Sequence, residues 1–260
     1  MAILVGQYES KRILITVRTY PTPAKHGIEV SCTAGMTEDG EWIRLFPVPY
    51  RFLSEDKRFR KYQWIEASVT KASDYRRESY HVDIDSIKIV SGRLPTKSKW
   101  KERKELLAPL LSDSLCSLQA RRDRDQFPTL GFFRPKKITS FDMQPVNPSW
   151  SESELGKLRQ VSLFQSAPAV ELVKIPFNFR YRFTCDEASC SGHDMSCIDW
   201  ELGQSYRRWR REYGEAEWEE KFRMRYEHDM MEKNATHFFV GTLRSHPASW
   251  IIVGLFYPRL

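Results

Sequence analysis

The chain has 260 residues, of which 41% are hydrophobic and 13% aromatic, and its formal net charge is +7. Enough apolar side chains are present to build a core, which excludes a wholly disordered chain. The length suits two modest domains or one larger domain with insertions. The excess of lysine and arginine favours a polyanionic partner, either nucleic acid or an anionic membrane surface.

The first half of the chain reads as short β-strands. Alternating apolar positions and tight turns predict strands at 12–20, 28–34, 42–48, 62–71 and 84–90. Asp39-Gly40 is a hairpin turn signal between two of them. This pattern predicts a small barrel or half-open sheet, with the oligonucleotide-binding barrel as one candidate. The pattern does not determine the strand order.

Apolar residues recur at helical spacing over 98–124, which predicts a helix there. Pro109 is expected to split it. Prolines near 147 indicate a linker, so we predict a β-rich domain at 1–147, including this helical insertion, and an α+β domain at 148–260. The second domain is expected to contain a helix at about 151–164, a strand at 171–184, two helices separated at Gly214 and a closing hairpin. The predicted fold class is therefore α+β, with an N-terminal small β-barrel and a C-terminal zinc-bearing domain.

Four potential metal ligands follow the second domain's strand. Cys185, Cys190, His193 and Cys197 have the spacing C-x4-C-x2-H-x3-C. Zinc prefers four thiolate or imidazole ligands, so these four residues predict a closed, structural Zn²⁺ site. The alternatives are unmetallated thiols, a redox pair of the first two cysteines, or an inward-facing last cysteine.

The other two of the five cysteines, Cys32 and Cys116, stand alone and are predicted to be buried apolar residues. Three cysteines within thirteen residues are more typical of metal binding in a reducing cytoplasm than of a secreted disulfide framework. Met1–Gln7 lacks the basic and long apolar regions of a secretory signal. No run of about 18 apolar residues occurs, so no membrane-spanning helix is expected.

The acidic residues after the cysteine loop suggest a second possible function, metal-dependent catalysis. His193, Asp199 and Glu201 could together bind a divalent cation in a metal-dependent nuclease. The competing interpretation is that both acids lie at a helix N-terminus, where they stabilise exposed N–H groups and the helix dipole. We favour this second interpretation over catalysis, and if the protein is an enzyme we expect a metal-dependent nuclease.

Aromatic and polar residues alternate throughout the strand Phe177–Phe183, which places four aromatic residues on one face. If that face lies inward, it forms part of the core; if it is exposed, nucleobases could stack on it. In either case Arg180 and Arg182 lie on the opposite face and are expected to meet phosphate.

A helix downstream carries a dense group of cations. Its packing stripe is expected to consist of Leu202, Tyr206, Trp209 and Tyr213. The flanking cations form a candidate phosphate-binding surface and are Arg207, Arg208, Arg210 and Arg211. The basic segments 97–104 and 134–137 are expected to extend that surface.

No Walker A loop, dinucleotide-binding glycine pattern or G-x-S-x-G motif occurs. The leading prediction is a zinc-stabilised nucleic-acid-binding protein of the cytoplasm, without a membrane partner. Single-stranded or structured nucleic acid is favoured over regular duplex, because no helix-turn-helix or finger helix is evident. The alternatives are the nuclease and a protein-interaction adaptor without catalysis.

Overall fold

The computed structural model describes residues 8–24, 29–159 and 171–260. The segment 1–7 and the end of the helix predicted at 151–164 lie outside these residues. The chain divides into two compact units, the first comprising 1–95 and 151–172, the second comprising 96–150 and 173–260. This division differs from the predicted boundary near 147. The helical segment predicted as an insertion in the first domain packs instead within the second unit.

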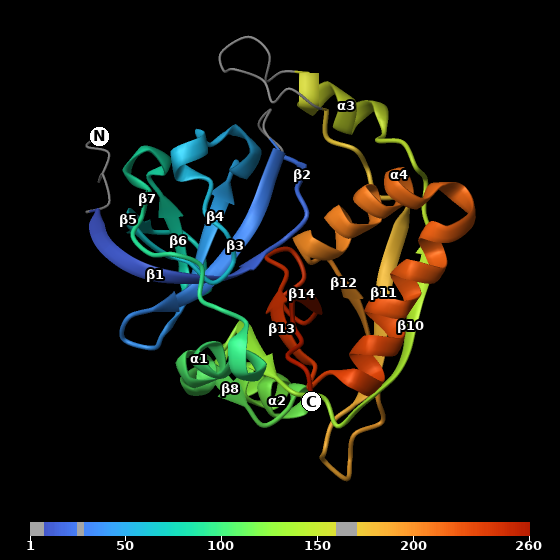
Figure 1. Cartoon of the computed structure of the whole chain (residues 1–260). Coiled ribbons are helices and arrows are strands. Elements are labelled where there is room, and N and C mark those ends of the chain that lie inside the picture. The colour runs from blue at the N-terminus through green and yellow to red at the C-terminus, as the bar shows by residue number, and fades with distance from the viewer. Residues whose placement is uncertain (1–7, 25–28, 160–170) are drawn as a thin grey trace. The chain divides into compact units, whose positions relative to one another are not determined.

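A closed five-stranded β-barrel forms the first unit (Figure 1). Its strands are β1 (Glu9–Arg18), β3 (Glu29–Thr37), β4 (Trp42–Val48), β5 (Trp64–Lys71) and β6 (Ser79–Val82). They pair in the order β1-β3-β4-β6-β5, and β5 pairs again with β1, which closes the barrel. The pair β4–β6 is parallel and the other four pairs are antiparallel.

Alternate positions of these strands fill the barrel, as the period-two pattern predicted. Ile13 and Ile15 of β1 pack with Ile43 and Leu45 of β4 and with Ile65 of β5, all at most 1% exposed. The predicted strand at 84–90 is mostly wrong, because only β7 (Lys88–Ile89) is extended there and a 3-10 turn precedes it. Smaller elements of the unit are β2 (Thr22–Pro23), the 3-10 turns Tyr50–Phe52, Glu55–Lys57 and Ile84–Ser86, and α3 (Glu152–Arg159).

A mixed seven-stranded sheet forms the second unit, in the order β10-β11-β12-β14-β13-β9-β8. Its strands are β8 (Leu111–Ser112), β9 (Leu130–Phe133), β10 (Lys137–Pro145), β11 (Phe177–Thr184), β12 (His193–Cys197), β13 (His237–Thr242) and β14 (Trp250–Phe256). The pairs β12–β14 and β8–β9 are parallel. The predicted closing hairpin of β13 and β14 is confirmed.

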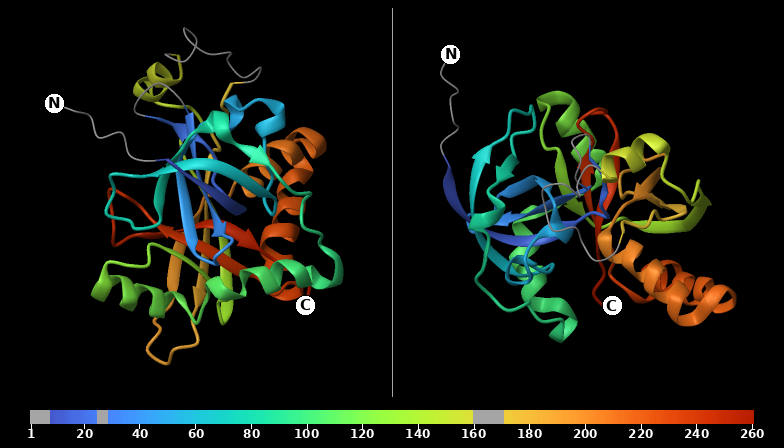
Figure 2. Two further views of the ribbon diagram at one scale, coloured as in Figure 1. Left: turned by 90° about the vertical axis from the view of Figure 1, so that its left-hand side faces the viewer. Right: turned by 90° about the horizontal axis from the view of Figure 1, so that it is seen from above.

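Helices of the same unit cover this sheet (Figures 1 and 2). They are α1 (Lys97–Leu107), a 3-10 turn (Ala108–Leu110), α2 (Leu115–Asp125), α4 (Trp200–Arg223) and the π-helical segment η6 (Met224–Lys233). Gly214 interrupts α4 with φ 68° and ψ −172°, which confirms the predicted break. Among the described residues, no helix combines the length and apolar character needed to cross a membrane.

Candidate metal centre and cationic groove

Strand β11 presents its aromatic face to the core. Phe179, Tyr181 and Phe183 are at most 4% exposed, and Phe179 lies 5.2 Å from the ring of Phe222 on α4. The Tyr181 hydroxyl donates a 2.6 Å hydrogen bond to the backbone oxygen of Tyr226. Burial raises the pKa of Tyr181 well above its usual value. These rings are therefore core residues, as the inward interpretation of the alternation predicted.

The opposite face of β11 is polar, but its arginines have partners within the sheet. Arg180 donates from Nε to Asp194 at 2.7 Å and from Nη1 to the Ser196 hydroxyl at 3.0 Å. The Nε atom of Arg182 lies 3.3 Å from the other oxygen of Asp194. Burial opposes ionisation of Asp194, but the hydrogen bonds from both arginines hold its pKa below the usual value. A phosphate at this surface would have to compete with Asp194 for both arginines.

Four metal-ligating side chains converge at one end of β11. Cys185 directly follows β11, Cys190 lies in the next loop, His193 begins β12 and Cys116 lies in the first turn of α2. The ligand atoms of these four residues all lie within 4.8 Å of one another. This cluster can bind a metal ion, and it joins α2 to the loop between β11 and β12.

The distances in the cluster match a tetrahedral site. The Nε2 atom of His193 lies 3.3 Å from Sγ of Cys116, 3.4 Å from Sγ of Cys185 and 3.5 Å from Sγ of Cys190. With Zn–S of about 2.3 Å and Zn–N of about 2.0–2.1 Å, tetrahedral geometry separates sulfur from nitrogen by about 3.5 Å. The three sulfur–nitrogen distances agree with this value, and all four ligand atoms lie within 4.8 Å of one another.

The surroundings of the cluster affect each ligand differently. Burial lowers the pKa of His193, which favours the neutral imidazole that binds metals. Burial, followed by the nearby charge of Cys185, raises the pKa of the Cys116 thiol to about 12. The backbone N–H of Cys185 donates to Sγ of Cys190 at 3.2 Å and lowers the pKa of that thiol. A bound cation would offset the cost of several thiolates in one place.

Cys197, one of the four predicted ligands, does not belong to the cluster. It lies in β12 opposite Phe179 and Ile252, is 3% exposed and packs in the aromatic core. Cys116, which the sequence predicted to be an apolar core residue, occupies the fourth position instead. It is 69 residues from the next ligand in sequence, so no local spacing motif connects it to the loop.

The residues of the nuclease hypothesis do not converge. His193 directs Nε2 to the three thiols, whereas Asp199 caps the N-terminus of α4. Its Oδ1 accepts from the Glu201 backbone N–H at 2.6 Å and its Oδ2 from that of Leu255 at 2.9 Å. Asp199 is 1% exposed and ties α4 to β14. The helix-terminus interpretation of these acids therefore agrees with the geometry.

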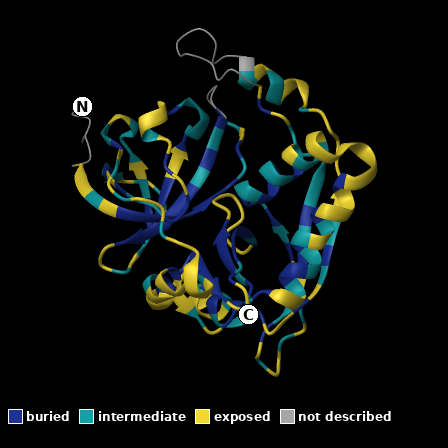
Figure 3. Ribbon diagram, viewed as in Figure 1, coloured by how far each residue is buried: buried dark blue, intermediate teal, exposed yellow. Residues whose placement is uncertain are grey.

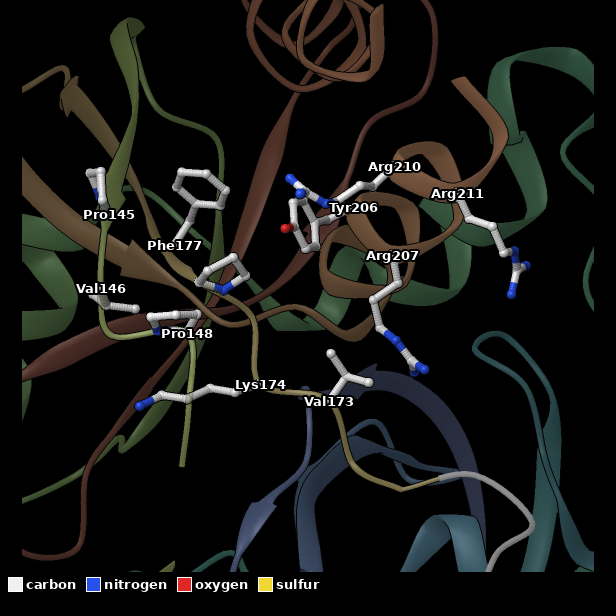
Figure 4. Close-up of a pocket in the computed structure, with 11 residues that line it drawn as sticks. Pro145, Val146, Pro148, Val173, Lys174, Phe177, Tyr206, Arg207, Arg210 and Arg211 are labelled. Atoms are coloured by element: carbon white, nitrogen blue, oxygen red, sulfur yellow. The ribbon is translucent and has the colours of Figure 1, made fainter. Parts of the chain in front are cut away.

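A groove of about 770 Å³ lies between the first half of α4 and the segments flanking β10 and β11 (Figure 4). One side is formed by apolar residues and one lysine, and the other by α4. The lining residues are Pro145, Val146, Pro148, Val173, Lys174, Pro176, Phe177, Tyr206, Arg207, Arg210 and Arg211. The lining contains four cationic residues, six apolar residues and no acidic one, so the groove is partly apolar and partly cationic.

Three of the four predicted α4 arginines line this groove, and they differ in their partners. Arg210 forms an ion pair with Glu215. Arg208, outside the groove lining, lies 3.9 Å from Glu212. Arg207 and Arg211 have no acidic partner among the residues that the structure describes. Figure 3 shows mostly half-buried positions in the first half of this helix, followed by exposed positions at 211–217. The predicted basic segments elsewhere are partly paired, as Lys136 is with Asp186 and Lys101 with Glu105.

Two family models match the chain. One, described as Domain of unknown function (DUF8758), covers residues 9–109, which include all five barrel strands. The other covers residues 111–260, which include the whole Cys/His cluster and the groove. A search of curated proteins gave no match. Because the second match spans more than half of the chain, the protein belongs to the family described as Domain of unknown function (DUF8757).

Proposed function

We propose that this protein binds nucleic acid through the α4 groove, with Arg207 and Arg211 as its principal phosphate contacts. The observation that carries the proposal is the pairing state of these two residues. They lie one helical turn apart, line the same groove and have no acidic partner within the described part of the chain. Two like charges four residues apart on a helix destabilise it by about 0.2–0.5 kcal/mol. An anionic ligand would remove that repulsion.

Phosphate suits this arrangement better than a single carboxylate does. Arginine presents a planar fork of donors that matches two phosphate oxygens, and several arginines can follow a phosphate backbone. Arg210 extends the cationic edge from a position fixed by Glu215. Arg180 and Arg182 have a smaller role in this proposal than the sequence predicted, because Asp194 already accepts from both.

We further propose that the Cys/His cluster is a structural Zn²⁺ site. Three thiolates with one imidazole form a common ligand set for structural zinc, and the sulfur–nitrogen distances suit its tetrahedral geometry. Four protein ligands leave no open position for a reacting water. The ion would fix the end of β11 against α2, and β11 at its other end contributes Phe177 to the groove.

The barrel offers a second, weaker support. Its strand order, with one parallel pair and a closing β1–β5 pair, is that of the five-stranded oligonucleotide-binding barrel. This is a likeness of fold and does not by itself assign a site.

The test is a salt titration of binding to a fluorescently labelled oligonucleotide. The double variant Arg207→Ala/Arg211→Ala should weaken binding and reduce the slope of log K against log salt by about 2, one for each lost phosphate contact. Arg208→Ala is the matched control for each of the single variants Arg207→Ala and Arg211→Ala, because it removes one positive charge from the same helix outside the groove lining. It should change the slope much less.

Two results would count against the proposal. One is the absence of any nucleic-acid binding at low salt by the folded protein, which would favour the adaptor hypothesis. The other is an equal loss of affinity in Arg207→Ala, Arg211→Ala and the Arg208→Ala control, which would indicate a diffuse charge effect without a defined groove.

A further inference from the structure

We infer that the α4 groove accepts an unpaired nucleobase, so that the ligand is single-stranded nucleic acid or an unpaired nucleotide within a folded one. This inference rests on the proposed function and specifies its substrate class. It concerns the apolar wall of the groove, which phosphate binding by Arg207 and Arg211 does not use.

That wall has a composition suited to a flat, apolar surface. Five of the lining residues carry compact apolar side chains and lie at the end of β10 or in the segments flanking β10 and β11: Pro145, Val146, Pro148, Val173 and Pro176. Val146 and Val173 are 40% and 44% exposed. These two exposed side chains lie beside the arginines of the groove, where an apolar part of a ligand could cover them. A polyphosphate without bases would leave them in water.

An aromatic ring lies at the end of this wall. Phe177 lines the groove and is only half-buried, in contrast to Phe179 and Phe183 on the same strand. The centre of its ring lies 5.6 Å from that of Tyr206 in an edge-to-face arrangement. It lies 5.8 Å from the ring centre of Trp218, with the two rings tilted relative to one another. A nucleobase that stacks on an aromatic ring contributes about 1–3 kcal/mol to binding. Phe177 is therefore the stacking platform of the inferred site.

The wall is held in place before any ligand binds. The backbone N–H of Val146 donates to the Pro176 carbonyl at 2.9 Å, which joins the two flanking segments. Lys174 donates from Nζ to the Ser149 carbonyl at 3.0 Å and lies 5.4 Å from the centre of the Trp150 ring. Three prolines restrict the backbone further. A preformed surface loses little conformational entropy on binding, which favours affinity.

Size and shape also favour an unpaired base. The volume of about 770 Å³ lies within the range of small-molecule sites, roughly 300–1,000 Å³. The bases of a regular duplex are stacked and offer only their edges, so they cannot place a ring face on this wall. An unpaired nucleotide could place its base there while its phosphate meets the arginines of α4, which lie across the groove from Val146 and Phe177 in Figure 4.

The experiment compares four probes of about twelve nucleotides each: single-stranded oligo(U), single-stranded oligo(dT), a duplex, and an abasic strand with the same number of phosphates. The variant is Phe177→Leu, which keeps apolar bulk and removes the ring. Its matched control is Phe179→Leu, on the same strand and in the same core, but outside the groove lining. Val146→Ser tests the wall at an exposed position, where folding is little affected.

The inference predicts that the wild-type protein binds a single strand with bases at least fivefold more tightly than the abasic strand or the duplex. Phe177→Leu should weaken single-strand binding about fivefold to tenfold, leave abasic binding unchanged and differ from Phe179→Leu. Val146→Ser should weaken it about twofold to threefold.

Equal affinity for the abasic and base-bearing strands, together with no effect of Phe177→Leu, would overturn the inference. If Arg207→Ala/Arg211→Ala still weakened binding in that case, the proposed function would stand without it. If no probe bound at low salt, the proposed function would fail as well.

Discussion

The Sγ atom of Cys116 lies 3.3 Å from Nε2 of His193, although the two residues are 77 positions apart in the chain. This contact joins the first turn of α2 to the start of β12, where Cys185 and Cys190 complete a four-ligand cluster. A metal ion bound by the cluster would link elements that are distant in sequence. Closing such a long loop removes much conformational freedom from the unfolded chain. The cluster is therefore expected to contribute to the stability of the second unit.

The first prediction concerns metal content. The purified protein should contain about one zinc ion per chain, and Cys116→Ser should lower the zinc affinity at least tenfold because it removes one of four ligands. Cys197→Ser is the matched control, since it changes a cysteine of the core outside the cluster. It should reduce stability but retain the metal. Elemental analysis after dialysis against a mild chelator measures both; equal zinc loss in the two variants would contradict the assigned ligands.

A second prediction concerns Asp199. Replacing it with alanine removes the N-cap of α4 and leaves the Leu255 N–H without its acceptor. The free energy of unfolding should fall by about 2–4 kcal/mol, as measured in urea. Asp199→Asn retains one carbonyl oxygen as acceptor and should lose less. A variant at wild-type stability would show that these two hydrogen bonds contribute little.

The pH dependence of stability should reflect His237. Its ring stacks on Phe132 at 5.2 Å, and burial lowers its pKa to about 4, although the Ala235 carbonyl opposes the shift. In the unfolded chain the ring titrates near its ordinary value of about 6.5. The unfolded state therefore binds the proton first, and stability present above pH 6.5 is lost as the pH falls toward 4.

We expect this loss to reach about 2 kcal/mol, which is less than the full shift implies because the ring is only half-buried. His237→Phe keeps the stacking and removes the titration, so its unfolding free energy should decline less between pH 6.5 and 4. His193, whose pKa is also lowered, is present in both proteins and cancels in the comparison. Parallel pH profiles for the two proteins would rule out this role of His237.

A fourth prediction uses two glycines in different backbone conformations. Gly214 has φ 68° and ψ −172°, which residues with a Cβ avoid, and an added Cβ would meet no atom within 4 Å. Gly214→Ala should therefore destabilise the protein by about 1–3 kcal/mol through the backbone itself. Gly156, inside α3, also has open space around it. Gly156→Ala should stabilise by about 0.5–1 kcal/mol, so destabilisation by both substitutions would contradict the explanation.

Much of the fold could be predicted because its signals are local. Alternating apolar residues revealed four of the five barrel strands, and the strand Phe177–Phe183 appears as β11 with its aromatic face buried. Gly214 marked the break in α4 because a helix interior rarely contains glycine. Strand β6 was missed, since its four residues carry no clear alternation.

The order of the barrel strands and the division into units could not be predicted, because both depend on contacts between distant segments. The closing pair β1–β5 places Ile13 opposite Ile65, and the sequence of neither strand indicates which strand it pairs with. Likewise, residues 96–150 are continuous in sequence with the barrel but pack with the second sheet.

By itself the sequence determined the chemistry available: an aromatic strand, three ligands after it in Cys185, Cys190 and His193, and a run of arginines around Trp209. Only the tertiary structure decided which of these groups can act together. It replaced Cys197 with Cys116, because the position of Cys197 on β12 turns its thiol into the core. It also separated Arg180, held by Asp194, from Arg207 and Arg211 in the groove, because the pairing of a charge depends on which neighbours folding brings within reach.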